Sequence, residues 1–275
     1  MLKFLYGTII GRMCLKLLVN PKLSQKVGKF LDSEMSTCLI GPFIKKNGID
    51  MSDFAEEKPG SFNEFFTRQL KMGKRVIDDN KDSLIAPCDG HLSVYDITDS
   101  GVVIPIKQSR YTIAELLCDE ELAKEYYGGK CLVLRLGVDN YHRYCYFDGG
   151  TEGKWRSIPG ILNTVRPIAL SHVPVFVRNS REYTVLHTDN FGKAVQIEVG
   201  ALLVGKIVNH HATNSFERGD EKGYFMYGGS TIVILLEPNT ASVRADIMKE
   251  CNLGHEVGVK MGQKIGSAER RYNEE

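Results

Sequence analysis

The strongest constraint on the fold is a series of β-branched runs that begins near residue 80. Each run is bounded by Gly, Asp or Asn, which is typical of strands: LSVYDI, GVVIPI, CLVLRLGV, EYTVLH, AVQIEVGALLVGKIV and STIVILL. The preceding residues lack such runs and favour helices. The sequence therefore predicts an α+β protein with a helical N-terminal portion, residues 1–75, on a β-rich body, residues 76–275, of mostly antiparallel sheets.

Two capping-box patterns locate helices more closely. Residues 61–64 (SFNE) place Glu three positions after Ser and precede the segment FNEFFTRQLK. The three phenylalanines of that segment are spaced for one helical face, which indicates core packing. Residues 112–115 (TIAE) repeat the pattern and open TIAELLCDEELAKEYY. We expect a helix there that ends at Gly128-Gly129.

The basic residues are concentrated at the N-terminus. Residues 1–31 carry six Lys or Arg and no Asp or Glu, although the whole chain has a net charge of only +1. Lys3, Arg12 and Lys16 interrupt every long apolar run, which argues against a spanning helix. One helical face would gather Leu2, Tyr6, Ile9, Ile10, Met13 and Leu17. This pattern fits a helix in a bilayer interface, or equally a helix packed on the protein's own core.

Composition excludes several classes of protein. Hydrophobic residues make up 43% and charged residues 25%, which excludes collagen, a mostly disordered chain and a polytopic membrane protein. The near-neutral balance argues against a generally basic nucleic-acid binder. Seven cysteines, without a C-x-x-C pair, indicate free thiols in a reducing compartment.

A serine after two glycines is the first candidate for chemistry. Gly228 and Gly229 precede Ser230, and the apolar run STIVILL follows. The serine hydroxyl can attack the carbonyl of Gly229 and convert the amide into an ester, after which elimination breaks the chain. Ser230 then becomes dehydroalanine and hydrolyses to a pyruvoyl group at a new N-terminus. The alternative is an ordinary turn, since Gly-Ser also occurs at residues 266–267.

Two further segments carry groups that could act with this serine. His142 follows the run CLVLRLGV and can act as a general base or acid near neutral pH, or as a hydrogen-bonded structural residue. Asp89 lies in Pro87-Cys-Asp-Gly90, where Asp-Gly is typical of a turn. Its carboxylate could instead orient an imidazole.

Taken together, these segments resemble the phosphatidylserine decarboxylase family of pyruvoyl enzymes. The resemblance runs along most of the chain through motifs in order: Phe62-Asn-Glu-Phe-Phe-Thr-Arg68, Pro87-Cys-Asp-Gly90, Asp139-x-Tyr-His-Arg143, Val175-Phe-Val-Arg-Asn179, Val199-Gly-Ala-x-x-Val-Gly205, Lys222-Gly-Tyr-Phe225, Gly228-Gly-Ser-Thr231 and Val259-Lys-Met-Gly-x-Lys-Ile-Gly266. Several motifs in order are far more specific than any single one.

The resemblance implies self-cleavage between Gly229 and Ser230 into a large chain, 1–229, and a small chain, 230–275, that carries the pyruvoyl group. Phosphatidylserine would form a Schiff base with this group and leave as phosphatidylethanolamine plus CO2, without pyridoxal phosphate or a metal. In the family an Asp, a His and the cleavage Ser form the processing triad, and Asp89 and Ser230 match two of its members.

The third member of the triad departs from the family pattern. Family members often carry His-Arg-x-His, whereas this chain has His142-Arg-Tyr-Cys145. Either His142 serves both processing and decarboxylation, or the processing base is Cys145 or a distant histidine such as His91 or His172. Cations in matching motifs are candidates for substrate binding: Arg143, Arg178 and Lys206.

The resemblance also implies a location and partners. The basic N-terminus becomes a peripheral anchor on anionic membranes that contain phosphatidylserine, at the cytoplasmic face of the cell membrane. We expect no nucleic-acid partner, and a homodimer by analogy with the family. The close alternative is a pyruvoyl decarboxylase of another seryl phospholipid, such as an ether lipid.

Rival functions fit less well. A metal hydrolase lacks H-E-x-x-H, because Val259 stands where the second His would follow His255-Glu256. A serine hydrolase lacks the last glycine of G-x-S-x-G, since Ile232 occupies that position. A non-catalytic anionic-lipid-binding protein at the membrane surface would explain the N-terminus but not the ordered motifs.

Overall fold

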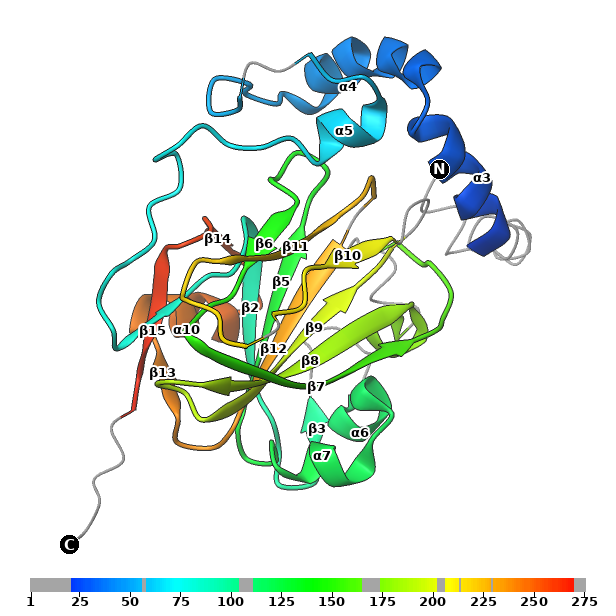
Figure 1. Cartoon of the computed structure of the whole chain (residues 1–275). Helices are drawn as coiled ribbons and strands as arrows, with labels where there is room; N and C mark the ends of the chain where they lie inside the picture. The colour runs from blue at the N-terminus through cyan, green and yellow to red at the C-terminus, as the bar shows by residue number, and fades with distance from the viewer. Residues whose placement is uncertain are drawn as a thin grey trace, which may run out of the picture.

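A seven-stranded antiparallel sheet forms the centre of the molecule in the computed structural model (Figure 1). The structure describes residues 21–55, 58–103, 111–164, 174–201, 206–212, 214–228 and 230–269. The strand order of this sheet is β14 (Val257–Val259), β2 (Gly90–Asp96), β5 (Lys130–Leu136), β12 (Ser230–Leu236), β9 (Lys193–Val199), β8 (Arg181–Thr188) and β7 (Gly150–Ile158). The expected α+β fold with mostly antiparallel sheets is confirmed.

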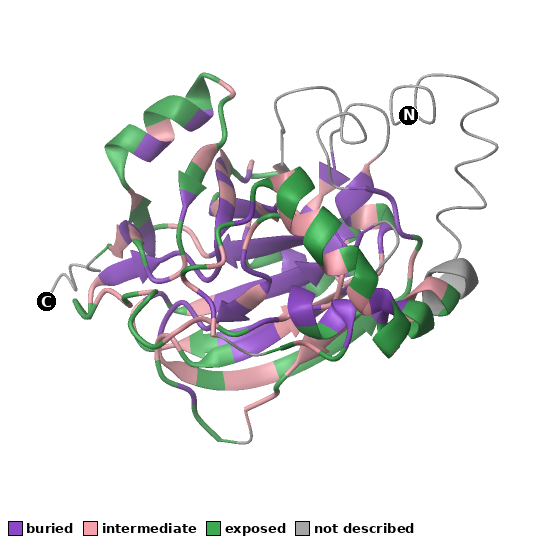
Figure 2. Cartoon of the chain, turned by 90° about the horizontal axis from the view of Figure 1, so that it is seen from above, coloured by how far each residue is buried: buried purple, intermediate pink, exposed green. Residues whose placement is uncertain are grey.

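The central strand β12 is buried along its whole length and contributes to two cores. Ile232, Ile234 and Leu236 belong to one hydrophobic cluster, and Val233 and Leu235 to the other. Side chains of a strand alternate between the faces of its sheet, which explains this division. By the same alternation, the Ser230 side chain shares the face of Ile232. Figure 2 shows the buried residues concentrated in the strands at the centre.

Smaller sheets lie beside the main one. A three-stranded sheet has the order β1 (Ser83–Ile85), β15 (Lys264–Ala268) and β13 (Ala241–Val243). Another has the order β10 (Ile207–Asn209), β11 (Glu221–Phe225) and β6 (Arg143–Cys145). A two-stranded ribbon pairs β3 (Val102–Val103) with β4 (Tyr111–Thr112). All of these pairs are antiparallel.

The N-terminal helices gather over one end of the central sheet (Figure 1). They are α3 (Pro21–Leu31), η1 (Glu34–Leu39), α4 (Ile40–Asn47) and α5 (Phe62–Phe66). The phenylalanines of α5 are buried with Phe43 nearby, as the helical spacing predicted. Ser61 caps α5 by accepting a hydrogen bond from the Glu64 N–H. The expected interfacial helix over residues 2–17 lies outside the described residues.

The second capping box forms as expected, but its helix is shorter than predicted. Thr112 and Glu115 cap each other's backbone at the start of α6 (Ile113–Leu117). Cys118 then adopts a left-handed conformation, and Asp119 begins a separate helix, α7 (Glu120–Lys124). Arg181 stabilises this break by donating to the carbonyls of Glu115 and Leu116 at the end of α6. The single helix extending to Gly128 was therefore wrong.

The remaining helices are α9 (Val175–Arg178) and α10 (Ala245–Asn252). Among the described residues, no helix has both the length and the hydropathy that crossing a membrane requires.

Candidate active site

Ser230 is the first residue of the central strand β12, opposite Leu136 at the end of β5. Its side chain is buried, and its hydroxyl has no hydrogen-bond partner among the described residues. Gly228, two residues earlier, has a φ of 144°, a conformation that glycine adopts readily. Gly229 itself lies outside the described residues. Several other buried hydroxyls also lack partners among the described residues, including that of Thr231, so the case for Ser230 rests on its position directly after the two glycines.

His142 lies just before β6, and its carbonyl accepts the N–H of Phe225 at the end of β11. This bond ties the histidine to the strand that leads toward Gly228. The ring is fully buried, with its centroid 4.1 Å from that of Phe66. Nδ1 is 2.9 Å from the carbonyl oxygen of Asn140, an atom that can only accept. Nδ1 therefore carries the proton, and the lone pair is on Nε2.

The Nε2 atom of His142 is buried and without a hydrogen-bond partner among the described residues. Burial is the main cause that lowers the pKa of His142 to about 3, and the positive charge of Arg68 lowers it further. The backbones of Asn140 and Gly228 and the charge of Asp89 act in the opposite direction. The ring is thus a neutral imidazole whose surroundings include the residue that precedes Gly229.

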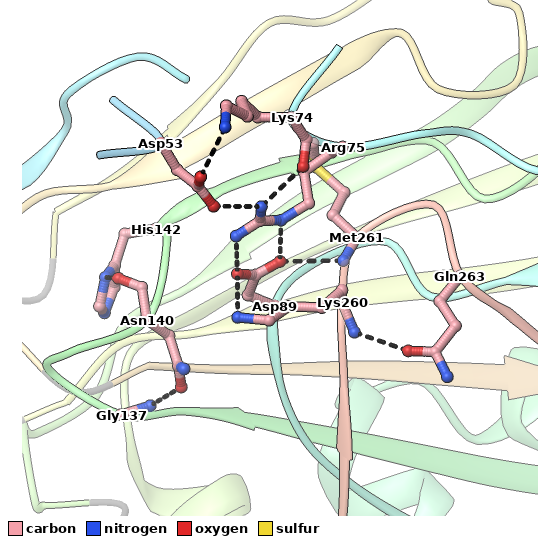
Figure 3. Close-up of polar contacts among 10 residues, drawn as sticks. All are labelled: Asp53, Lys74, Arg75, Asp89, Gly137, Asn140, His142, Lys260, Met261 and Gln263. Atoms are coloured by element: carbon pink, nitrogen blue, oxygen red, sulfur yellow. Dashed lines mark hydrogen bonds and ion pairs between the residues drawn. The ribbon is translucent and has the colours of Figure 1, made fainter. Parts of the chain in front are cut away.

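Asp89 is buried beside these groups and forms a network of its own (Figure 3). Arg75 donates two hydrogen bonds to the carboxylate, from Nε to Oδ1 at 2.8 Å and from Nη2 to Oδ2 at 2.6 Å. The N–H of Met261 and the ammonium of Lys260 complete the network at 2.9 and 3.3 Å. Burial alone would raise the pKa of Asp89, but these partners outweigh it and lower the pKa. The carboxylate is therefore ionised.

The carboxylate of Asp89 does not orient the imidazole directly. The Asn140 carbonyl holds Nδ1 of His142, while Asp89 acts on the ring through its charge. The sequence analysis did not single out the Asn140 carbonyl, although Asn140 lies within the motif Asp139–Arg143, and no sequence pattern pointed to Arg75. Arg75 lies 14 residues before Asp89, in a segment without a motif.

The other candidate bases differ in their surroundings. Cys145 on β6 is buried, and burial raises the pKa of its thiol to about 12. The thiol is therefore protonated at neutral pH, which disfavours it as a base. His91 on β2 is half-buried opposite Arg135. His172 lies outside the described residues.

The three expected substrate cations are not equivalent. Arg143 donates to Glu221 at 2.8 and 3.0 Å and to the Thr67 carbonyl at 2.8 Å, so it holds α5 against β11. Arg178, at the end of α9, is exposed. Lys206 is also exposed, and its carbonyl accepts the N–H of Met226, just before Gly228.

The N-terminal helices fix the segment that leads to the serine. The Tyr227 ring packs edge-on against Phe43, Phe62 and Phe66. The Asn63 side chain accepts the N–H of Tyr227 at 3.3 Å. The motif FNEFFTR thus contacts both the histidine ring and the backbone before Gly228. This arrangement defines a candidate active site built on a buried serine hydroxyl and a neutral histidine.

Comparison with known proteins identifies the family. Residues 62–267 match the family model described as phosphatidylserine decarboxylase. The chain is 48% identical to phosphatidylserine decarboxylase proenzyme 2 of Clostridium acetobutylicum, over 96% of this chain and 91% of that protein. It is 42% identical to the proenzyme of Ruminiclostridium cellulolyticum and 40% identical to that of Clostridium kluyveri, with coverage of 97% and 96% of this chain and 91% of each relative.

This chain belongs to the phosphatidylserine decarboxylase family, and the resemblance drawn from its motifs is confirmed. Membership makes it a decarboxylase-family enzyme. The relatives are named proenzymes, a term that denotes a precursor requiring processing.

Proposed function

We propose that this chain is a precursor that cleaves itself between Gly229 and Ser230 and then decarboxylates phosphatidylserine to phosphatidylethanolamine and CO2. The observation that carries the proposal is a neutral, buried His142 beside the Gly228 backbone, two residues before a buried Ser230 hydroxyl that has no partner among the described residues. The names of the relatives support the same substrate.

The first step uses only groups of the chain. Nε2 of His142 takes the hydroxyl proton of Ser230 as Oγ bonds to the carbonyl carbon of Gly229. The C–N bond between the two residues then breaks, the proton passes to the departing nitrogen, and an ester remains. Because the pKa of His142 is low, the ring holds this proton only transiently.

The second step breaks the chain. Removal of the Cα proton of Ser230 expels Oγ, and Gly229 leaves as a new C-terminal carboxylate. The remaining unsaturated residue takes up water and releases ammonia, which gives chains 1–229 and 230–275. The site fits this product, since residue 230 occupies a buried position with no competing hydrogen bond.

When formed, the pyruvoyl group supplies an electrophilic ketone that accepts the electrons released with CO2. The chain's own residues bind the headgroup, exclude water and return a proton to the carbon that loses CO2. We assign this transfer to His142, whose Nε2 takes a proton from the ammonium group of the bound substrate and then delivers it to this carbon. The Phe66 ring covers the buried imidazole, and Tyr227 packs against Phe66 in turn.

We also propose that the N-terminal helices associate peripherally with anionic membranes. Exposed apolar side chains on α3 and η1 lie near exposed lysines on α3 and α4: Phe30, Met35 and Leu39 with Lys26, Lys29, Lys45 and Lys46. Each cation near an anionic surface contributes roughly 1 kcal/mol. Flotation with phosphatidylserine vesicles should weaken as salt rises, and unchanged flotation after replacement of these four lysines by Gln would contradict this role.

The activity is tested by incubating the purified protein with phosphatidylserine in mixed micelles and measuring phosphatidylethanolamine by mass spectrometry. We expect product from the wild type and none from Ser230→Ala. Ser267→Ala is the matched control, because it follows a glycine in the same dipeptide but lies on β15. Tight vesicle binding without product would instead support a non-catalytic lipid-binding protein, and product from a serine ether phospholipid alone would change the substrate.

The homodimer implied by the resemblance remains a proposal. Sedimentation equilibrium of the purified protein measures it directly, and a monomer at micromolar concentration would contradict it.

A further inference from the structure

Arg68 is a buried cation that the proposed mechanism does not use. It follows α5, and its side chain is 9% exposed. Its guanidinium lies over the ring of Phe54, at 4.0 Å from the centroid, and over that of Phe65, at 4.8 Å. Nη1 donates to the Phe65 carbonyl at 3.3 Å. These contacts fix the plane of the guanidinium and give one of its nitrogens, Nη1, a hydrogen-bond acceptor.

The opposite edge of this guanidinium has no partner. Nε and Nη2 are buried and make no hydrogen bond to a described residue. The N–H groups on this edge are parallel and can donate two hydrogen bonds to one carboxylate or phosphate, which is bidentate binding. A carboxylate occupies the corresponding edge in three other arginines: Arg75 with Asp89, Arg135 with Glu256, and Arg244 with Asp246.

Arg68 remains charged in this setting. Burial lowers its pKa to about 10, which still leaves the guanidinium protonated at neutral pH. A buried charge without a counter-ion is costly, so an anion that fits the free edge would bind favourably. Among the described residues, no carboxylate forms an ion pair with Arg68. Its positive charge instead lowers the pKa of His142.

The position of Arg68 links it to the reacting groups. Two residues earlier, Phe66 packs its ring against both His142 and Tyr227. Because Arg68 lowers the pKa of His142 through its charge, the two side chains share one electrostatic environment. Arg68 therefore lies within electrostatic reach of His142, a residue assigned to the reaction.

We propose that Arg68 binds the phosphodiester of the phospholipid headgroup through Nε and Nη2. This assignment rests on the proposed function. The headgroup of phosphatidylserine offers two anions, a carboxylate and a phosphodiester. The carboxylate is lost as CO2, so a cation bound to it would stabilise the ground state and slow the reaction. The phosphodiester keeps its charge throughout and can be held from substrate to product.

Arg68→Gln and Arg68→Lys test the assignment in the processed enzyme with a short-chain, soluble phosphatidylserine. Losing a charge-assisted bidentate contact should raise KM by roughly 10- to 100-fold in Arg68→Gln, with little change in kcat or in the extent of self-cleavage. Arg68→Lys keeps the charge and much of the packing, so its KM should rise less. Arg244→Gln is the matched control, since that arginine is exposed and pairs with Asp246.

Calorimetric titration separates the two anions. Glycerophosphoethanolamine carries the phosphodiester without the carboxylate, and L-serine carries the carboxylate without the phosphodiester. We expect Arg68→Lys and Arg68→Gln to weaken binding of the first and leave binding of the second unchanged. Weakened binding of L-serine alone would overturn the phosphodiester assignment.

The kinetic outcomes distinguish this inference from the proposed function. An unchanged KM in both Arg68 variants, with an active wild type, refutes the role of Arg68 only. A wild type that cleaves itself but does not decarboxylate phosphatidylserine refutes the proposed function first. Thermal unfolding of each variant shows whether it still folds. If Arg68→Gln does not fold, the KM of Arg68→Lys is compared with that of the wild type instead.

Discussion

Burial of His142 predicts an unusual pH dependence of self-cleavage. An ordinary histidine, with a pKa of 6.5, would be about 10% neutral at pH 5.5 and about 90% neutral at pH 7.5. A base of that kind would make cleavage roughly tenfold slower at the lower pH. With a pKa of about 3, His142 is neutral across this whole range. Cleavage that uses His142 as the base should therefore proceed at nearly the same rate at pH 5.5 and 7.5.

The assay is cell-free synthesis of the precursor followed by dilution into buffers between pH 5 and 8. The appearance of chain 1–229 is followed on gels. His142→Ala should slow cleavage by roughly 10²- to 10⁴-fold, the usual contribution of a general base. His187→Ala is the matched control, because His187 is exposed on β8. A tenfold fall in rate with a midpoint near pH 6.5 would refute the buried-base reasoning.

The same shift in pKa affects folding stability. The unfolded chain binds a proton at His142 below pH 6.5, whereas the folded chain resists it down to about pH 3. Stability therefore falls as pH decreases through this window, by roughly 2 kcal/mol between pH 6.5 and 5. Urea unfolding of the uncleaved Ser230→Ala precursor measures this slope. The slope should become shallower when His142→Ala is added, and an unchanged slope would contradict the assignment.

Three further substitutions probe neighbouring groups. Arg75→Met leaves the Asp89 carboxylate buried without its main partner and should lower the free energy of unfolding by about 3–5 kcal/mol; a loss below about 1 kcal/mol in chemical denaturation would show that the pair matters little. Lys222→Met leaves the fully buried Glu198 without its cationic partner and should also lower the free energy of unfolding. Protonation of Glu198 at low pH should restore part of that lost stability. Cys145→Ala should keep self-cleavage near the wild-type rate, because a protonated thiol does not act as the base; loss of cleavage in a folded variant would restore Cys145 as the processing base.

The sequence predicted most of the fold because its signals are local. The run STIVILL coincides with β12, and both capping boxes form. Strand β7 was missed, since residues 150–158 contain few β-branched residues and are mostly exposed or half-buried. The break at Cys118 was missed because Arg181, distant in sequence, stabilises it.

The candidate site residues could be named from the sequence for a related reason. Ser230, His142 and Asp89 belong to motifs that can be read along the chain. The groups that control them are harder to read: the Asn140 carbonyl, which orients the imidazole, is a backbone atom within the motif, and Arg75, which holds Asp89, lies outside any motif. The Arg75 contact depends on how separate segments meet, which periodicity does not reveal. The division into residues 1–75 and 76–275 also remains a prediction.

Intact-mass spectrometry of the purified protein tests self-processing most directly. Self-cleavage between Gly229 and Ser230 predicts two chains, with the smaller beginning at position 230 and lighter by one ammonia than a fragment that begins with serine. That mass would establish conversion of Ser230 into the pyruvoyl group. A single chain of 30.8 kDa, or a small chain that still begins with serine, would contradict self-processing at this site.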